Sequence, residues 1–243
     1  YALGSGLVGS EMCIRDRVNF AQRTFGRKNT NDVYATATSD GQFETRFTTN
    51  IWPDQSITIP MMGDYNVNNA LAAISVGQIY QIPQLEIVQK LAHFQVTKNR
   101  TEWLTGNRGE KILSDVYNSN PTAAKEVLNA FSRTKTDGRR IAVLGDMLEL
   151  GEKSPEMHAS LKQAIDPTVI SVVYLIGEDM QALYQQLKPV FAPENLHYYH
   201  ADQLDQLTAD LQADIQSTDE VMLKASHGIH LENVVKKMLA KSE

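Results

Sequence analysis

Two short runs of the chain are apolar at every position: residues 141–144 read Ile-Ala-Val-Leu, and residues 172–176 read Val-Val-Tyr-Leu-Ile. A strand with one face in water alternates apolar and polar residues, whereas a strand buried on both faces does not. The two runs therefore predict strands of a parallel sheet that helices cover on both sides.

The same pattern extends from these runs over most of the chain, starting near residue 110. Short β-branched and apolar segments alternate with segments that carry apolar residues at helical spacing. This alternation predicts an α/β domain with an open, mostly parallel, Rossmann-like sheet, whose ligands gather at the carboxyl ends of the strands. The expected strands are 111–114, 140–144, 169–176, 196–199 and 220–224, and the expected helices are 123–131, 155–165, 180–187, 204–215 and 231–240.

The part before residue 97 has a different pattern. Residues 32–39 and 42–48 are rich in β-branched and aromatic residues and flank Asp40-Gly41, which indicates a β-hairpin. Residues 56–59 alternate at period two and predict another strand, so that this region contains a small antiparallel layer.

Two helices are expected after this layer. Apolar residues at helical spacing predict a helix over 66–80, with Asn66 as a plausible N-cap, and a shorter helix over 85–94. Residues 97–108 are polar and have no periodicity, which indicates a linker. We therefore expect a domain boundary there, between residues 18–97 and residues 98–243.

The composition of the chain argues against two classes of partner. Hydrophobic residues make up 42% and charged residues 21%, the net charge is −6, and no dense Lys/Arg tract is present. An acidic chain without such a tract is a poor partner for nucleic acid or an anionic membrane surface, and no apolar run has the length of a membrane span. The single cysteine, Cys13, allows no internal disulfide, which fits the cytoplasm. We expect a cytoplasmic protein with no nucleic-acid partner and no membrane insertion.

Residues 1–17 read YALGSGLVGSEMCIRDR and match none of the motifs described below. We expect this segment to be a non-native lead-in that takes no part in the fold. The alternative is a genuine lead-in with little pattern.

Polar side chains follow the first expected strand of the α/β region. Asp115, Tyr117, Asn118 and Asn120 stand between that strand and Pro121, which suits the first position of a helix. The crowding of hydrogen-bonding groups at a strand end indicates a binding site. The alternative is a capping turn, in which Asp and Asn serve the backbone alone.

Two further strand ends carry polar residues. Asp146 and Glu149 lie in a loop bounded by glycines, and the last expected strand ends in Lys224-Ala-Ser226 before a turn that can expose backbone N–H groups to an anion. The alternatives are an ordinary acidic surface loop and a tight turn with an exposed lysine. His158, on the helix after the first loop, is alone and has no assigned role.

The expected helix that begins at Asn66 carries a second amide at Asn69, on the same face. An amide side chain offers both a donor and an acceptor to an adenine edge. The alternative is an N-cap with a solvated asparagine. From residue 18 onward, the sequence contains no GxxxxGK[ST] P-loop, no GxGxxG fingerprint, no GxSxG elbow and no Cys/His cluster with zinc spacing.

The motifs occur together in an order that resembles the Mur ligase family. The pieces that follow residues 115 and 145 are similar to the members that add D-alanyl-D-alanine (MurF-type), and the resemblance runs from about residue 18 to the end. The motifs are Gly63-x-Tyr65-Asn66-x-x-Asn69, Asn99-Arg100-Thr-Glu-Trp103, Asp115-x-Tyr-Asn-x-Asn-Pro121, Gly145-Asp-Met-x-Glu-Leu-Gly151 with His158, and Lys224-x-Ser226.

The resemblance implies an ATP-dependent amide-bond ligase of peptidoglycan synthesis. Its substrates would be UDP-N-acetylmuramoyl-tripeptide and D-alanyl-D-alanine, joined through an acyl phosphate, and the full-length protein would be monomeric. Residues 18–97 would be the end of a central ATP-binding domain without its P-loop, and residues 98–243 would be the carboxy-terminal ligase domain. We expect the P-loop and the magnesium ligands upstream of this chain and assign no catalytic residue within it, so that this chain would be inactive alone.

The resemblance also implies roles for individual residues. ATP would be bound by Asn66, Asn69, Arg100 and Asp115, at the adenine, phosphates and ribose. The dipeptide and its junction with the nucleotide would be lined by Tyr117, Asn118, Asn120, Asp146, Glu149, Lys224 and Ser226. Tyr65 and Ala225 stand where many members have His and Gly.

Three other readings remain open from the sequence. They are a diamino-acid-adding Mur ligase, a folylpolyglutamate synthetase, and a non-enzymatic α/β nucleotide-binding domain. The absence of an Asp-Asn-Pro-Arg tetrapeptide argues against a diaminopimelate adder. On the ligase reading, Asp115→Ala should raise the KM for ATP and leave stability little changed.

Overall fold

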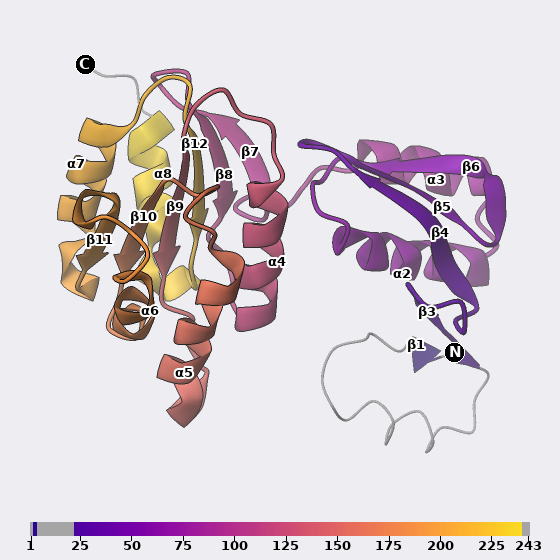
Figure 1. Ribbon diagram of the computed structural model, residues 1–243. Helices are drawn as coiled ribbons and strands as arrows, with labels where there is room; N and C mark the ends of the chain where they lie inside the picture. The colour runs from indigo at the N-terminus through magenta and orange to yellow at the C-terminus, as the bar shows by residue number, and fades with distance from the viewer. Residues whose placement is uncertain (1, 4–21, 240–243) are drawn as a thin grey trace. The chain divides into compact units, whose positions relative to one another are not determined.

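The computed structural model describes residues 2–3 and 22–239 (Figure 1). The chain divides into two compact units, the first ending at Gln95 and the second beginning at Val96. The expected lead-in at residues 1–17 lies outside the described residues, except for Ala2–Leu3 (β1), which pairs in parallel with Gln22–Arg23 (β2).

The first unit is a four-stranded sheet that packs against two helices, α2 and α3, through a core of buried apolar residues. The antiparallel hairpin expected around Asp40 is present, and a third antiparallel strand follows it. In sheet order the strands are β3 (Phe25–Gly26), β4 (Val33–Asp40), β5 (Thr45–Thr49) and β6 (Trp52–Ile59); the helices are α2 (Asn66–Ile79) and α3 (Gln84–His93).

Two details of the first unit differ from the expectation. β6 begins at Trp52 and so contains Pro53, which a strand at the edge of a sheet tolerates because one side needs no ladder hydrogen bonds. Asn66 is not the N-cap of α2: Tyr65 precedes the helix, and the Asn66 side chain donates from Nδ2 to the carbonyl of Met62 at 2.9 Å. The Asn66 amide is thus directed back into the fold.

The second unit contains a six-stranded sheet in which five strands run parallel and β7, at one edge, runs antiparallel. This confirms the open, mostly parallel α/β sheet. In sheet order the strands are β11 (Leu196–Tyr199), β10 (Val172–Ile176), β9 (Arg140–Gly145), β12 (Glu220–Lys224), β8 (Lys111–Asp115) and β7 (Glu102–Thr105).

Helices cover both faces of this sheet, which explains why β10 and β12 are buried at every position. One face packs against α7 and α8 through a core that includes Ile141, Tyr174 and Leu223. α4, α5 and α6 pack together on the other face (Figure 1). The helices are α4 (Pro121–Ser132), α5 (Ser154–Ala159), α6 (Met180–Leu187), α7 (Leu204–Asp214) and α8 (Leu231–Leu239).

The prediction of a linker at residues 97–108 is wrong, because this segment contains the strand β7. This strand pairs with β8 from Glu102 opposite Ser114 to Thr105 opposite Lys111. Four residues at a sheet edge carry too little alternation to be distinguished from a loop, and only the pairing with β8 makes them a strand. β10 is shorter than expected because Val169 and Ile170 donate their N–H groups to Asp166 in a turn.

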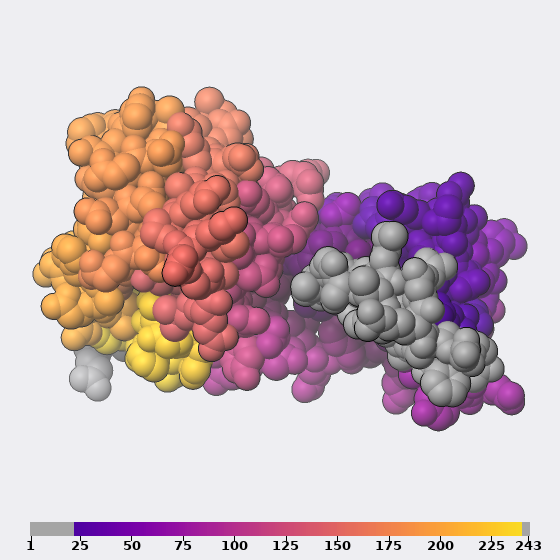
Figure 2. All heavy atoms as spheres, turned by 90° about the horizontal axis from the view of Figure 1, so that it is seen from below, coloured from indigo at the N-terminus to yellow at the C-terminus, as the bar shows by residue number. Residues whose placement is uncertain are grey.

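The strand order brings the three polar strand ends together. β12 lies between β8 and β9, so the residues that follow these three strands are neighbours at the carboxyl end of the sheet. Figure 2 looks onto this end of the second unit, where the rose-to-red segment that follows β9 lies beside the yellow segment that follows β12.

Candidate functional site

An ion pair joins the ends of β8 and β12. Lys224 lies opposite Asp115 in the parallel register, and its Nζ donates to Asp115 Oδ2 at 2.6 Å and to the carbonyl of Asn118 at 3.0 Å. The Lys224 side chain is 1% exposed. The alternative of a tight turn with an exposed lysine is therefore excluded, and the ammonium holds the end of β8 and the turn that follows it.

Asp115 is also bound from the other side, where the backbone N–H of Thr101 donates to its Oδ1 at 3.2 Å. An ionised carboxylate has about four acceptor positions. The contacts with Thr101 and Lys224 use one on each oxygen. The buried carboxylate therefore keeps acceptor capacity for hydroxyl groups of a ligand at the strand end.

The capping turn proposed for this segment exists, but Asn120 makes it. Asn120 Oδ1 accepts from the N–H of Ala123 at 2.9 Å, and Pro121 occupies the first turn of α4, as expected. Asp115 does not cap α4. The sequence did not distinguish the Asp115 carboxylate from the Asn120 amide as the cap. In the structure, the carboxylate pairs with Lys224 and the amide caps α4.

An exposed cationic and aromatic surface adjoins this pair. The guanidinium of Arg100 lies over the ring of Tyr117, with Cζ 4.5 Å from the ring centroid, a cation–π geometry. The Tyr117 ring is half exposed and lies 5.9 Å from the ring of His227. His227 follows β12, in the segment 224–228 that the family resemblance assigns to the dipeptide pocket. Its place beside Tyr117 was not expected, since only the adjacency of β8 and β12 brings the two rings together.

The Asp146 side chain turns into the fold. Its Oδ1 accepts from the N–H of Met180 at 2.9 Å and its Oδ2 from that of Asp179 at 3.4 Å, so it binds the start of α6. Burial raises the pKa of Asp146, and these backbone hydrogen bonds oppose the rise. Gly177 has φ +118°, and a Cβ there would lie 2.2 Å from Asp146 Cγ, so only glycine fits beside this carboxylate.

Ser226 connects the loop after β9 with the turn after β12. Its Oγ accepts from the N–H of Leu148 at 2.9 Å, and its own N–H donates to the carbonyl of Asp146 at 3.1 Å. Glu149, the next residue of the loop, is exposed and has φ +65°. Of the acidic pair expected here, only Glu149 presents its side chain to solvent.

The two expected adenine residues lie in the first unit, on a cavity of about 650 Å³. The cavity is formed by α2, α3 and the end of β6, and its lining is mainly apolar. Asn69 Nδ2 donates to Asn66 Oδ1 at 3.2 Å, which leaves Asn69 as the more available amide. An apolar cavity with a few polar groups suits a flat heteroaromatic ligand. Gly63 has φ +91°, and a Cβ there would lie 2.2 Å from the Tyr65 ring.

Within residues 22–239, no group of three or more His, Cys, Asp and Glu side chains is arranged to hold a metal ion. In the part of the chain that the structure describes, no helix combines the length and the apolar character needed to cross a bilayer.

Comparisons with known proteins agree with the arrangement of these motifs. Residues 99–227 match the family described as Mur ligase, glutamate ligase domain. The chain is 28% identical over 232 residues to the UDP-N-acetylmuramoyl-tripeptide–D-alanyl-D-alanine ligase of Bacillus subtilis, a match that covers 96% of this chain and 50% of that protein.

The fold is also similar to solved structures. MurF from Acinetobacter baumannii superposes with a TM-score of 0.79 at 21% identity, over 98% of this chain and 51% of that one. The MurF ligase from Thermotoga maritima, in complex with ADP, gives 0.69 at 21% identity, over 89% and 48%. The chain spans about half the length of the curated relative and of both solved chains.

Proposed function

The chain belongs to the Mur ligase family, and from this membership we propose that it provides the dipeptide site and part of the nucleotide site of an ATP-dependent ligase that adds D-alanyl-D-alanine to UDP-N-acetylmuramoyl-tripeptide. The observation that carries the proposal is the meeting of three motifs at one end of the sheet. The ends of β8 and β12 are joined by Asp115 and Lys224, and the loop after β9 is bonded to Ser226.

The nucleotide half of the proposal is made for each unit by itself. In the first unit, the apolar cavity beside Asn69 would bind an adenine ring. In the second unit, Asp115 would accept hydrogen bonds from the ribose hydroxyls, with Lys224 holding its carboxylate in place. Arg100, stacked on Tyr117, would contact the phosphates, because a guanidinium binds phosphate oxygens well.

The dipeptide half uses the loop after β9 and the turn after β12. Tyr117, the Asn118–Asn120 turn and Glu149 would border the dipeptide, while Asp146 and Ser226 would shape its pocket from behind. Asp146 and Ser226 are engaged with the chain itself, through α6 and through Leu148. Lys224 would act in the same indirect manner, since its ammonium is bound by Asp115 and Asn118.

ATP, when bound, would supply the phosphoryl group that activates the carboxylate of the precursor for attack by the amine of the dipeptide. The residues of this chain would bind and orient the adenosine and the dipeptide. The sequence has no P-loop, and the described residues have no metal-binding group. We therefore place the β- and γ-phosphate site and the Mg²⁺ ligands outside this chain.

The same proposal covers the biological setting. A ligase with these soluble, charged substrates would act as a monomer in the cytoplasm. Its product would be a peptidoglycan precursor, on which cell-wall growth, cell shape and cell division depend.

A ligand titration of the 243-residue chain tests the dipeptide half. We expect D-alanyl-D-alanine to shift the backbone amide resonances of Leu148, Glu149 and Ser226, and L-alanyl-L-alanine to shift them far less. Ser226→Ala, which removes the acceptor of the Leu148 N–H, should weaken dipeptide binding roughly tenfold. Ser132→Ala is the matched control, because that hydroxyl donates to a carbonyl within α4.

Two other ligands separate the competing readings. Binding of diaminopimelate or glutamate at the same residues, with no response to D-alanyl-D-alanine, would favour a diamino-acid-adding ligase or a folylpolyglutamate synthetase. ADP should shift the amides of Thr101 and Val116, beside Asp115. Phosphate release by the chain alone, with both substrates, ATP and Mg²⁺, should not exceed that of a mock preparation.

A further inference from the structure

His158, in α5, is completely buried, and both of its ring nitrogens bind backbone groups. The N–H of Met147 lies 2.8 Å from Nε2, and the carbonyl of Ser154 lies 2.7 Å from Nδ1. A backbone N–H can only donate and a carbonyl can only accept, so the ring must carry its proton on Nδ1 and is neutral. Nε2 is therefore the acceptor that holds the Met147 N–H.

This contact is one of three that hold successive N–H groups of the loop after β9. Asp146 donates to the carbonyl of Ile176 at 3.2 Å, Met147 donates to His158, and Leu148 donates to Ser226 Oγ at 2.9 Å. The three partners come from β10, α5 and the turn after β12. The backbone of the loop is thus held from three directions immediately before Glu149.

Two exposed side chains depend on this anchoring. Leu148 is 45% exposed, and its Cδ1 would lie 2.8 Å from a Cβ at Gly228, so its side chain packs over the turn after β12. Glu149 follows in the left-handed region, with φ +65°, a conformation that a non-glycine residue adopts only when its surroundings enforce it. Release of the Met147 N–H would leave the Leu148–Ser226 hydrogen bond as the last backbone anchor before Glu149.

The polar groups around the ring argue against a role in proton transfer. Asp146 Oδ1 is 3.9 Å from Nε2 and accepts from the N–H of Met180. Ser154 Oγ is 3.3 Å from Nδ1 and donates to Asp179 Oδ2 at 2.6 Å. The lone pair of Nε2 is already used by Met147, and a general base must reach the proton that it removes. The imidazole is placed to hold the chain and not to react.

We propose that His158 is a positioning residue that keeps the Met147–Glu149 segment in the conformation that receives the dipeptide. The inference rests on the proposed function, because that function assigns this loop to D-alanyl-D-alanine. His158 acts through the Met147 N–H and does not touch the ligand.

Two substitutions in the 243-residue chain test the role. In His158→Gln the amide oxygen can still accept from the Met147 N–H, whereas in His158→Leu nothing can. We expect His158→Leu to weaken D-alanyl-D-alanine binding roughly tenfold and to speed hydrogen exchange of the Met147 amide by a similar factor. His158→Gln should stay within about threefold of the unmodified chain in both measurements, and ADP binding should not change in either variant.

Thr208→Val is the control for a general loss of stability. Thr208 is buried in α7, and its hydroxyl donates to the carbonyl of Leu204 at 2.7 Å. Its loss should lower the melting temperature without changing dipeptide binding. The proposal would be overturned if His158→Leu left both dipeptide binding and Met147 hydrogen exchange unchanged. An equal loss of dipeptide binding in Thr208→Val would also overturn it.

A measurement on the unmodified chain covers the case in which His158→Leu does not fold. His93 is an exposed histidine in α3 whose Nδ1 also lies 2.8 Å from the carbonyl four residues earlier, that of Gln89. We expect saturating D-alanyl-D-alanine to shift the ¹⁵N resonance of His158 Nε2 and not that of His93. A dipeptide that binds without moving the His158 signal contradicts the proposal. A different outcome is a chain that fails to bind the dipeptide while hydrogen exchange of the Met147 amide still depends on His158. That result would refute the proposed function, and with it this inference, which rests on that function.

Discussion

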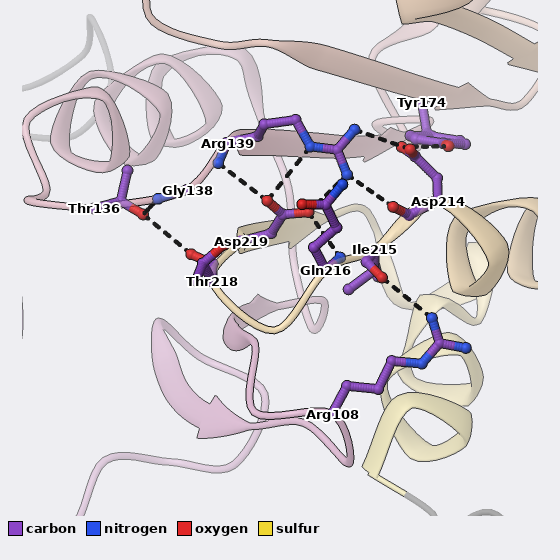
Figure 3. A network of polar contacts seen from close by, with 10 residues as sticks. All are labelled: Arg108, Thr136, Gly138, Arg139, Tyr174, Asp214, Ile215, Gln216, Thr218 and Asp219. Atoms are coloured by element: carbon purple, nitrogen blue, oxygen red, sulfur yellow. Dashed lines mark hydrogen bonds and ion pairs between the residues drawn. The ribbon is translucent and has the colours of Figure 1, made fainter.

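The two ends of the sheet in the second unit both carry ion pairs with a buried carboxylate, yet they differ in what surrounds the charges. At the amino end, Arg139 precedes β9 and is bound by Asp219, which precedes β12, and by Asp214 at the end of α7 (Figure 3). Arg139 Nη2 lies 2.7 Å from Asp219 Oδ2, and Nη1 lies 2.9 Å from Asp214 Oδ1. Asp219 also accepts from the backbone N–H groups of Arg139 and Gln216.

At the carboxyl end, the Asp115–Lys224 pair is more deeply buried than the Arg139 pairs, but exposed groups stand beside it. Arg100, Tyr117 and His227 form a cationic and aromatic surface next to the pair. The charges at the amino end connect the starts of β9 and β12 with the end of α7. An ion pair with a buried carboxylate is thus no mark of a site by itself, and strand direction separates the two ends, because ligands of parallel sheets bind where the strands finish.

The largest effect is expected from breaking the pair at the carboxyl end. Asp115→Ala leaves the Lys224 ammonium buried without its partner, which should cost about 3–5 kcal/mol of unfolding free energy in urea. The expectation that this substitution leaves stability little changed is therefore revised by the structure. Asp115→Ala/Lys224→Met should recover a large part of the stability and still lack the proposed ADP binding. A single-variant loss below about 1 kcal/mol contradicts the assigned burial of the pair.

The matching substitution at the amino end should separate stability from binding. Asp219→Ala removes the carboxylate that holds Arg139 and the Gln216 N–H, and we expect a loss of about 2–3 kcal/mol, because Arg139 retains partial access to water. ADP and D-alanyl-D-alanine binding should be unchanged at temperatures where the variant is folded. A weaker affinity there would mean that the amino end also serves the site.

The two ends should titrate in opposite directions. Burial alone would raise the pKa of Asp219, but the hydrogen bonds from Arg139 and Gln216 hold it below its ordinary value. Its contribution to stability is present above the unfolded-state pKa, near 3.8, and is lost as the pH falls through the lower folded pKa. Burial raises the pKa of Asp146, so its contribution is present below 3.8 and is lost as the pH rises through the higher folded pKa.

Unfolding free energies between about pH 3 and 6 check this opposition. Asp219→Asn should remove part of the fall in stability on the acid side, and Asp146→Asn should remove a decline in stability on the other side. Parallel pH profiles for the two variants would contradict the difference between the ends.

The smallest effect is expected at the border of the amino-end network. The hydroxyl of Tyr174 donates to Asp214 Oδ2 at 3.2 Å, on the side of Asp214 away from Arg139 (Figure 3). Tyr174→Phe should cost about 0.5–1 kcal/mol and leave ligand binding unaltered. Tyr199→Phe, which removes a comparable hydrogen bond to Asp210, is the control. A loss above about 2 kcal/mol would show that the hydroxyl supports the Arg139 pairs cooperatively.

Strands of the parallel sheet were the most predictable part of the fold. β11 and β12 have the expected bounds, because a run of apolar and aromatic residues next to a polar turn is a local signal. β7 was not predicted from the sequence, because these residues form a strand only by pairing with the edge of β8. Asn66 was misassigned for a similar reason: an asparagine before a helix is typically a cap, and the reach of its amide back to Met62 has no sequence signature.

The candidate site divides in the same way. The motifs after β8, β9 and β12 could be found in the sequence because polar residues cluster at strand ends. The sequence alone also predicted the Rossmann-like sheet, indicated the family resemblance and identified most of the residues that the candidate site contains. The tertiary structure decided the task of each side chain. Asp115 meets Lys224, 109 residues away along the chain, and Leu148 meets Ser226 across 78. Pairings over such separations depend on strand order and register, and β12 enters the sheet between β8 and β9 through long-range packing that no local pattern encodes.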